Sequence, residues 1–432
     1  MKILLIQPNY APESSFLDIL ALKLYTSPYI TLQQLATITP ESHSVELLDE
    51  VFQHIDFTKE CDLVGITCCT PTAPRAYEIA DEYRRKGIKV VLGGYHPSAL
   101  PEEAKQHADC VVIGEAENSW PLLLKDLEKN QLHPFYQSEK PADLTYFPPL
   151  KQGIGEHAFW TTRVETTRGC PFCCEFCSLS NIKIGWHVFR KKPVENVIRE
   201  LHSIPQKMLI FCDASLTIDL EYTKSLFKEM KYLNKKFFCF GNAHILNRDD
   251  ELLQLAKEAG CIMWNIGFES IIQETVNNIG KKTNKVKEYV SIVKKIRNHG
   301  MAVNGQFIFG FDSDNIDIFD ATTETIDNLG IDAPSINILV PYPGTPLFDR
   351  LERERRILTK DWSQYTLDNV VFQPKNMSKE ELLNGAHNVA KTFYSPSNVI
   401  KRCLKSIKLG FYPSIGVIGQ NLYAKGFYKK IA

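Results

Sequence analysis

The amino-acid sequence predicts an α/β fold with two parallel sheets, followed by a small helical region. Two observations lead to this prediction. Short runs of Val, Ile and Leu alternate with amphipathic segments over residues 1–133, and the same alternation restarts at residue 163. Near-continuous apolar strands that alternate with helices are typical of parallel sheets covered on both faces. The 432 residues are enough for two or three domains, each with its own core.

The first region is expected to form an open, Rossmann-like sheet. Its five expected strands are KILLIQP, SVELLDE, LVGITCC, KVVLGGY and CVVIGEA. Apolar residues at spacings of three and four predict helices in PRAYEIADEYRRKG and NSWPLLLKDLEKNQ. Ligands of such sheets lie beyond the carboxyl ends of the strands. The loops expected at that edge are residues 68–74, 93–98 and 114–118.

Residues 134–162 are rich in proline and lack periodicity, which predicts a linker. Strands and helices then alternate again over residues 163–372. The expected strands are RVETTRG, MLIFCDAS, FFCFGNAH, IMWNIGFES, AVNGQFIFG and SINILVPY. They predict a partial (β/α)6 barrel, similar to a TIM barrel, whose active face lies at the carboxyl ends of the strands. Residues 373–432 are expected to form a small, basic, helical region.

Composition and charge narrow the class of protein. A net charge of −1 provides no global field for binding nucleic acid. The apolar run at the amino terminus is short for a secretory signal, and no apolar run reaches the roughly 18 residues of a spanning helix. We therefore expect a cytoplasmic protein. In that reducing compartment, the 12 cysteines favour metal binding or catalysis over disulfides.

The segment RGCPFCCEFCS, residues 168–178, carries four cysteines directly after a predicted strand. Cys170, Cys174 and Cys177 have the spacing C-x3-C-x2-C, which suits an iron–sulfur cluster. Four thiolates complete a four-iron cluster, so three leave one iron open to another ligand. A structural zinc site needs four ligands, usually as two separate pairs, and no second pair follows in the sequence. A zinc knuckle or an incidental set of cysteines is the alternative.

This cysteine motif after a strand resembles the signature of the radical S-adenosylmethionine (SAM) family. In that family SAM chelates the open iron, and its reductive cleavage yields a 5′-deoxyadenosyl radical. The resemblance extends to IGFES, FCDAS, GQFIFGFDSD and PYPGTPLFDRLERER. It implies a [4Fe–4S] cluster on Cys170, Cys174 and Cys177, with Cys173 as a bystander. The residues that it implies at SAM are Phe176, Arg190, Asp213, Glu269, Ser270 and Gly310. A tight turn at Gly310 and an exposed position for Arg190 are the alternatives.

Residues 70–127, together with the predicted barrel, resemble the cobalamin-binding branch of the radical SAM family. The residues that this implies at cobalamin are Thr70, Thr72, Gly93, Gly94, His96, Gly114 and Glu115. The D-x-H-x-x-G motif, which supplies a histidine ligand to cobalt in many cobalamin domains, is absent. The resemblance therefore implies cobalamin bound without a protein histidine on cobalt. A domain that has lost cobalamin and serves as a scaffold is the alternative.

The carboxyl-terminal region is basic and rich in aromatic residues, with no Asp or Glu after Glu381. In IKRCLKSIKLGF, spacings of three and four place Ile400, Leu404, Ile407 and Phe411 on one helix face. A basic helix with such a face suits peripheral contact with an anionic membrane. A solvated carboxyl-terminal subdomain is the alternative.

Together, the resemblances imply a cobalamin-dependent radical SAM enzyme, with methylation of an unactivated carbon as the favoured reaction. A small-molecule or lipid-like substrate and an external electron donor of flavodoxin or ferredoxin type are implied, and no nucleic acid. One alternative is cyclisation or rearrangement with B12 but without net methylation. Others are a SAM-only radical enzyme with a degenerate B12 domain and a non-catalytic, zinc-bound interaction module.

Overall fold

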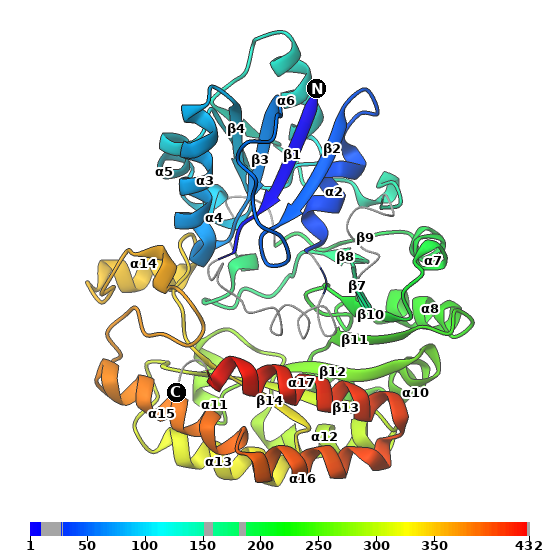
Figure 1. The fold of residues 1–432 in the computed structure, drawn as a ribbon. Coiled ribbons are helices and arrows are strands. Elements are labelled where there is room, and N and C mark those ends of the chain that lie inside the picture. The colour runs from blue at the N-terminus through cyan, green and yellow to red at the C-terminus, as the bar shows by residue number, and fades with distance from the viewer. Residues whose placement is uncertain (10–26, 28, 151–158, 181–186, 430–432) are drawn as a thin grey trace.

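The computed structural model describes residues 1–9, 27, 29–150, 159–180 and 187–429. Within these ranges the chain forms two six-stranded parallel sheets and one two-stranded antiparallel ribbon. In Figure 1 the first sheet, blue to cyan, lies above the second, and the arrow of β1 points toward the second sheet. The carboxyl edge of the first sheet therefore faces the rest of the molecule.

The first sheet has the strand order β2-β1-β3-β4-β5-β6, with every neighbouring pair parallel. Its strands are β1 (Lys2–Gln7), β2 (Ser44–Asp49), β3 (Leu63–Thr67), β4 (Lys89–Gly93), β5 (Cys110–Ile113) and β6 (Phe135–Gln137). The first five are the expected strands. The sixth lies in the segment expected to be a linker, where three residues pair along the free edge of β5. Residues 151–158 of the expected linker lie outside the described residues.

Helices cover both faces of this sheet, as the near-continuous apolar strands predicted. They are α2 (Ile30–Ile38), α3 (Ala73–Arg85), α4 (Tyr95–Ala99), α5 (Pro101–His107) and α6 (Ser119–Glu128). Leu4 and Ile6 of β1 join one core with α3 and α5. Ile3 and Leu5 of the same strand join a second core with α2 and α6. Because side chains alternate along a strand, one run of apolar residues supplies both cores.

The second sheet has the order β14-β13-β12-β11-β10-β7 and is also parallel throughout. Its strands are β7 (Thr161–Val164), β10 (Met208–Phe211), β11 (Lys236–Phe240), β12 (Cys261–Glu269), β13 (Ala302–Phe309) and β14 (Ala333–Ile338). All six strands were expected. Sequential strands lie side by side, so the sheet curves as an open barrel (Figure 1).

Helices connect these strands. They are α7 (Val194–Ser203), α8 (Leu220–Met230), α9 (Ala243–Arg248), α10 (Asp250–Ala259), α11 (Gln273–Asn278), α12 (Tyr289–Asn298), α13 (Ile318–Leu329) and α14 (Pro346–Arg353). Three of them, α8, α10 and α14, begin at a residue whose side chain accepts from a free backbone N–H group. The carboxylates of Asp219 and Asp249 accept from the backbone N–H groups of Tyr222 and Leu252 at the starts of α8 and α10. Gly260 ends α10 in the left-handed conformation that glycine favours.

A short antiparallel ribbon closes the cysteine loop at its base. It pairs β8 (Thr167–Arg168) with β9 (Arg190–Lys191), on either side of that loop. Gly169 follows β8 with a φ of +83°, and a Cβ atom there would lie 2.0 Å from the carbonyl oxygen of Val188. Only glycine allows the two arms to approach this closely.

The carboxyl-terminal helices are α15 (Lys379–Phe393), α16 (Pro396–Ser406) and α17 (Phe411–Lys429). Ser378 and Glu381 form a capping box at the start of α15. Val417 of α17 and Leu409 join a small core with Met208, Ile262 and Ala302, which lie at the amino ends of β10, β12 and β13. The last helix therefore covers the end of the barrel opposite the carboxyl edge. No helix in the described ranges is both long and apolar enough to cross a bilayer.

Candidate functional site

A cavity of about 640 Å³ lies where the carboxyl ends of the two sheets meet. Its volume falls within the roughly 300–1,000 Å³ of small-molecule sites. The first domain contributes the loops after β3, β4 and β5 together with α2, and the second domain contributes residues 165, 167–169, 178–179, 212, 214 and 342. The sequence predicted a ligand site at the carboxyl edge of each sheet, and in the structure both edges border this one cavity.

The wall from the first domain consists largely of small residues. Thr70, Gly93, Gly94, Gly114 and Glu115, all predicted at cobalamin, line the cavity. Gly94 has a φ of +96°, and a Cβ atom there would lie 2.7 Å from both the Cys68 carbonyl oxygen and Thr67 Oγ1. The backbone is thus packed too closely for a side chain at this point, and Gly94 presents backbone alone to the cavity.

Two other residues predicted at cobalamin, Thr72 and His96, lie outside the cavity lining. Thr72 Oγ1 bonds to the backbone of Cys69. The His96 ring is fully buried, with Nδ1 3.3 Å from Thr70 Oγ1 and Nε2 3.2 Å from Glu103 Oε1. Both ring nitrogens of His96 have protein partners, and a role of this residue at cobalamin stays a prediction. These contacts agree with the missing D-x-H-x-x-G motif.

The cysteine loop leaves the ribbon beside this cavity, and Gly169 and Ser178 at its two ends line it. The backbone N–H of Glu175 donates to the Ile279 carbonyl, and that of Leu347 donates to the Glu175 carbonyl. The Glu175 carboxylate accepts from Arg350 at 3.0 Å. The end of α11 and the first turns of α14 therefore fix the middle of the cysteine loop.

The three predicted ligands are sheltered, whereas Cys173 is exposed. Burial raises the pKa of the Cys174 thiol to about 12, although the nearby Lys281 ammonium opposes this shift. Burial also raises the pKa of Cys170 and Cys177, while the backbone N–H groups of Phe172 and Leu179 act in the opposite direction. N–H groups and a cation around thiols favour the thiolate form that binds iron.

Lys281 is a residue of this site that the sequence-based prediction missed. Its Nζ lies 2.5 Å from Glu269 Oε1. Burial acts to lower the pKa of Lys281, but Glu269 and the thiols of Cys174 and Cys177 outweigh it, so the pKa is raised. Lys281 therefore stays charged beside the cysteine loop. Nothing in KKT distinguishes it from the exposed Lys282, because only the fold brings it next to residues a hundred positions earlier.

Glu269 and Ser270, predicted at SAM, end β12 at the carboxyl edge. Glu269 is buried and has a φ of 65°, uncommon for a residue other than glycine. A Cβ atom on Gly267 would lie 2.2 Å from Glu269 Oε1, so the glycine makes space for this carboxylate. Ser270 Oγ accepts from the Ile272 N–H. Strain at a strand end beside a cysteine loop is typical of a functional site.

Phe176 and Gly310, also predicted at SAM, take part in packing. The rings of Phe176 and Phe311 meet edge to face with centroids 6.0 Å apart. Gly310 has a φ of +107°, and a Cβ atom there would lie 2.8 Å from a methyl group of Leu382 in α15. The turn considered for Gly310 is therefore present, and close packing against α15 requires it. Contacts of either residue with SAM stay predictions.

Asp213 lies below the cavity floor, between the lining residues Cys212 and Ala214. Its carboxylate accepts hydrogen bonds from the backbone N–H and the hydroxyl of both Thr166 and Thr167. Burial nevertheless raises its pKa to about 6. Asp213 thus fixes the junction from which the cysteine loop starts, and a direct contact with SAM stays a prediction.

Arg190 and Glu115 were predicted at different cofactors, but they bind each other. The Arg190 guanidinium donates to both carboxylate oxygens of Glu115, at 2.6 and 2.7 Å, and to the Ala142 carbonyl oxygen at 2.8 Å. Burial acts to raise the pKa of Glu115, but Arg190 and Arg168 hold it below its usual value. The pair links the loop after β5 to the ribbon, and a contact of Arg190 with SAM stays a prediction.

Arg168 strengthens the same junction. It lies 2.6 Å from Glu117, 2.8 Å from Glu165 and 3.8 Å from Glu115. Glu165 in turn accepts from Gln34 of α2 at 2.8 Å. We call Arg168, Arg190, Glu115, Glu117 and Glu165 the interdomain clamp. It lies beside the cavity and joins its two walls.

These observations fit the groups that the sequence implies. Three sheltered thiols with N–H donors and a neighbouring cation suit an iron–sulfur cluster. Among the described residues, no three His, Cys, Asp or Glu side chains converge on one point as the ligands of a single metal ion do. Cysteines of a four-iron cluster bind different irons, so they need not converge in this way. The cradle at Gly94 and the open cavity suit a large ligand.

Family models match three parts of the chain. The radical SAM superfamily matches residues 164–326, the B12 binding domain matches residues 32–124, and a domain of unknown function (DUF4070) matches residues 345–414. Bacteriochlorophyllide d C-8(2)-methyltransferase of Chlorobaculum tepidum is 32% identical over 404 residues, which cover 86% of this chain and 89% of that protein. Bacteriochlorophyllide d C-12(1)-methyltransferase of the same organism is 28% identical over 416 residues, covering 93% and 89%.

Among solved structures, the radical SAM methyltransferase TsrM from Kitasatospora setae, with cobalamin and a [4Fe–4S] cluster bound, has a similar fold. The TM-score is 0.70 at 15% sequence identity, covering 100% of this chain and 99% of that chain. At this identity the likeness concerns the fold. It supports the arrangement of two parallel sheets with facing carboxyl edges.

Proposed function

This chain belongs to the radical SAM superfamily, in the branch with a B12-binding domain, and we propose that it methylates an unactivated carbon of a small-molecule or lipid-like substrate. It is an enzyme whose cofactors are a [4Fe–4S] cluster, SAM and cobalamin. The observation that carries the proposal is the single cavity between the glycine-rich loops of the B12-binding domain and the cysteine loop of the barrel. Methyl transfer to a carbon radical needs both cofactors to reach one substrate.

In this proposal the residues of the chain bind, orient and shelter the reactants. When bound, the cofactors supply a radical that abstracts hydrogen and a methyl group that can be transferred. Cys170, Cys174 and Cys177 hold the cluster, and Lys281 stabilises its negative charge. The Gly94 turn leaves space on the opposite wall. The interdomain clamp keeps the walls at a fixed separation, so that bound groups are positioned before reaction.

We propose a largely apolar substrate. The cavity wall formed by α2 includes Ile30, Leu35 and Ile38, and Trp120 and Tyr342 add aromatic surface. Such walls bind an apolar ring system, whereas the carboxylates at one end give it an orientation. The two relatives named above act on bacteriochlorophyllide d, so a related substrate is the first to test.

The proposal also includes two partners. An external electron donor of flavodoxin or ferredoxin type reduces the cluster. Peripheral contact with a membrane, through the basic carboxyl-terminal region, gives access to an apolar substrate that dissolves poorly in water.

The test is anaerobic reconstitution with iron, sulfide and cobalamin, followed by reaction with SAM that carries a deuterated methyl group. Bacteriochlorophyllide d and apolar extracts of the source cells serve as substrates, and products are analysed by mass spectrometry. We expect transfer of the labelled methyl group to carbon and production of 5′-deoxyadenosine. The Cys174→Ser variant should yield neither.

Two results would change the proposal. Formation of 5′-deoxyadenosine with a rearranged, unlabelled product would favour the alternative of cyclisation without net methylation. Full activity of the enzyme without corrinoid would favour a radical enzyme that uses SAM alone.

A further inference from the structure

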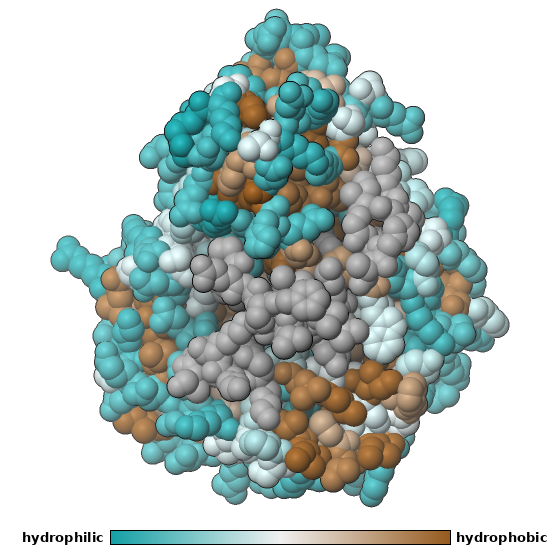
Figure 2. Space-filling model, in the orientation of Figure 1, coloured by the Kyte–Doolittle hydropathy of each residue, from teal (hydrophilic) through white to brown (hydrophobic). Residues whose placement is uncertain are grey.

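The α16–α17 hairpin exposes a continuous row of large apolar side chains. Ile400, Leu404, Ile407 and Phe411 are 58%, 61%, 62% and 73% exposed. Ile418 and Leu422, seven and eleven residues after Phe411 in α17, are 38% and 49% exposed. We call these six residues the apolar stripe. Figure 2 shows hydrophobic surface gathered over these two helices at the lower right. Exposed apolar patches of this kind mark interaction sites.

The buried face of α16 fixes the stripe in this exposed orientation. The helix buries Val399, Arg402 and Ser406 instead of its most apolar side. The Arg402 guanidinium donates to Asn421 Oδ1 at 2.7 and 2.9 Å and to the Phe393 carbonyl oxygen at 2.6 Å. Rotating α16 to bury the stripe would break these bonds and leave a buried charge without acceptors, which is costly. The exposure is therefore built into the fold.

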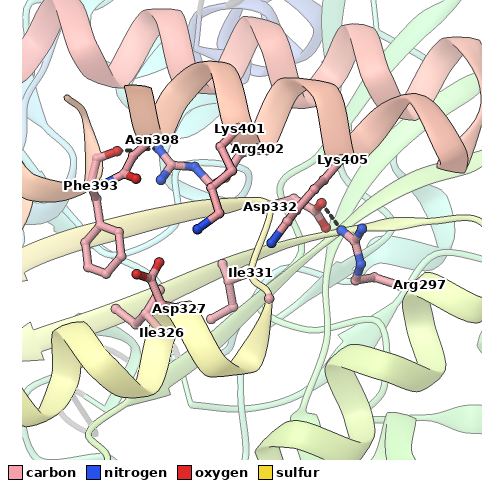
Figure 3. Close-up of a pocket in the computed structure, with 11 residues that line it drawn as sticks. Arg297, Ile326, Asp327, Ile331, Asp332, Phe393, Asn398, Lys401, Arg402 and Lys405 are labelled. Carbon is pink, nitrogen blue, oxygen red and sulfur yellow. Dashed lines mark hydrogen bonds and ion pairs between the residues drawn. The ribbon is translucent and has the colours of Figure 1, made fainter. Parts of the chain in front are cut away.

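Lysines border the stripe on one side. Lys401, Lys405 and Lys408 are exposed, and within the described residues none of them forms an ion pair. Figure 3 shows Lys401 and Lys405 reaching over a small pocket between α16 and α13, with Asp327 opposite. The other carboxylate there, Asp332, is paired with Arg297. The pocket thus has free cationic groups next to an apolar surface.

We propose that the apolar stripe and Lys401, Lys405 and Lys408 dock this enzyme on an anionic phospholipid membrane. Aliphatic and aromatic side chains would enter the interface, and the ammonium groups would bind headgroup phosphates. The contact is peripheral, since no described helix can span a bilayer. The inference rests on the proposed function only for its biological purpose, to bring the enzyme to an apolar substrate.

The charges favour a membrane over a second copy of the chain. A two-fold dimer through this face would bring the three lysines of each copy toward those of the other. No Asp or Glu follows Glu381, so the hairpin carries no acidic partners for them. Like charges across an interface are unfavourable, whereas an anionic bilayer neutralises them.

The face also lies away from the catalytic cavity. The helix α17 packs on the amino ends of the barrel strands, and the cavity is at their carboxyl ends. Docking would therefore hold the enzyme at the membrane without covering the cavity. Substitutions in the stripe should leave the cofactor sites unchanged.

The test is flotation of the full-length, reconstituted enzyme with vesicles of phosphatidylcholine alone or with added phosphatidylglycerol. We expect binding to the anionic vesicles that is at least tenfold stronger than to the neutral ones and that weakens with salt. Leu404→Gln with Ile407→Gln should reduce binding at least tenfold. Each of the three lysines should contribute about fivefold, so Lys401→Gln, Lys405→Gln and Lys408→Gln together should reduce binding roughly a hundredfold.

Matched controls exclude general effects on folding and charge. Leu122→Gln with Ile316→Gln changes apolar side chains of similar exposure elsewhere, and Lys287→Gln with Lys294→Gln removes exposed lysines just before and within α12. These should bind as the unchanged enzyme does, with the same Tm. Methyl transfer to a substrate dissolved in detergent should survive in the stripe variants, which separates this inference from the proposed function.

Three outcomes would overturn the inference. The first is that the enzyme without substitutions does not float with anionic vesicles. The second is that the stripe variants bind anionic vesicles as strongly as the enzyme without substitutions. The third is a dimer in solution that Leu404→Gln with Ile407→Gln dissociates, because the stripe would then be a protein interface.

Discussion

The two walls of the cavity are built in opposite ways. The wall from the B12-binding domain presents glycines, threonines and apolar side chains, and its charged residues lie at one end. The wall from the barrel includes Gly169 and Ser178, at the two ends of the cysteine loop, and charged residues lie near that loop, among them Asp213, Glu269 and Lys281. One wall provides space for a large ligand, and the other provides ligands and charge for reactive groups. The substitutions below exploit this difference.

Replacing one sulfur atom by oxygen at the cysteine loop should have the largest effect of the substitutions considered. Replacing Cys170, Cys174 or Cys177 by Ser should remove most of the roughly four irons per chain and abolish SAM cleavage, because each thiolate holds a different iron. Cys173→Ser is the matched control and should retain iron and activity, since Cys173 is exposed beside the cluster. Iron content and 5′-deoxyadenosine formation are the measurements. Loss of iron in the Cys173 variant would contradict the assignment.

The wall from the B12-binding domain should be sensitive to added volume instead. Gly94→Ala places a Cβ atom 2.7 Å from the Cys68 carbonyl, whereas Gly87→Ala has a similar φ, +79°, with nothing within 4 Å. Gly87→Ala should cost about 1 kcal/mol for its positive φ. Gly94→Ala should cost roughly 1–3 kcal/mol for the backbone, because φ +96° with ψ −167° is a conformation that essentially only glycine adopts. Gly94→Ala should cost a further 1–3 kcal/mol, roughly, for the clash.

Chemical denaturation measures that difference, and corrinoid content after reconstitution should fall in the Gly94 variant alone. If the Gly94 and Gly87 variants were equally stable, the backbone around Gly94 would be able to shift away from Cys68 and relieve the clash. In that case the close packing would not shape the wall.

The interdomain clamp joins the walls, and weakening it should affect activity without removing either cofactor. Arg190→Gln loses two charged hydrogen bonds to Glu115, each worth roughly 1.5–3 kcal/mol. We expect methyl transfer to fall at least tenfold while iron content stays constant. The control is Arg199→Gln, an exposed arginine that donates to Asn196 Oδ1 at 3.3 Å. A normal rate in the Arg190 variant would mean that the linker alone sets the separation of the walls.

The smallest expected effect concerns pH. Burial raises the pKa of Asp213 to about 6, above the roughly 3.9 of an unfolded chain. Between these values the folded protein binds more protons than the unfolded one, so this group lowers the free energy of unfolding as pH rises. From pH 5 to pH 7 the loss should be about 1 kcal/mol.

Asp213→Asn should remove the fall of the free energy of unfolding with pH. The altered hydrogen bonds to Thr166 and Thr167 should also change that free energy by the same amount at every pH. Denaturation at several pH values measures the difference between the two proteins. A difference that stays constant from pH 5 to pH 7 would contradict the raised pKa.

Much of the fold was predictable, because the signals are local. Alternating apolar runs located 11 of the 12 strands in the two parallel sheets, and the cysteine spacing located the loop between β8 and β9. The exception, β6, is three residues long and too short for a periodic pattern. Side-chain pairs were harder to predict. Neither Arg190 with Glu115 nor Lys281 with Glu269 has a sequence signal that names its partner.

By itself, the sequence determined the two parallel sheets, the order of their loops and the three thiols, because strand periodicity and motif spacing act within a few residues. Only the tertiary structure decided what these features face. It placed His96 against Glu103, brought Lys281 to the cysteine loop and turned the apolar side of α16 outward. Those outcomes depend on contacts between residues far apart in the chain, where burial of a charge and its hydrogen-bond partners decides the arrangement.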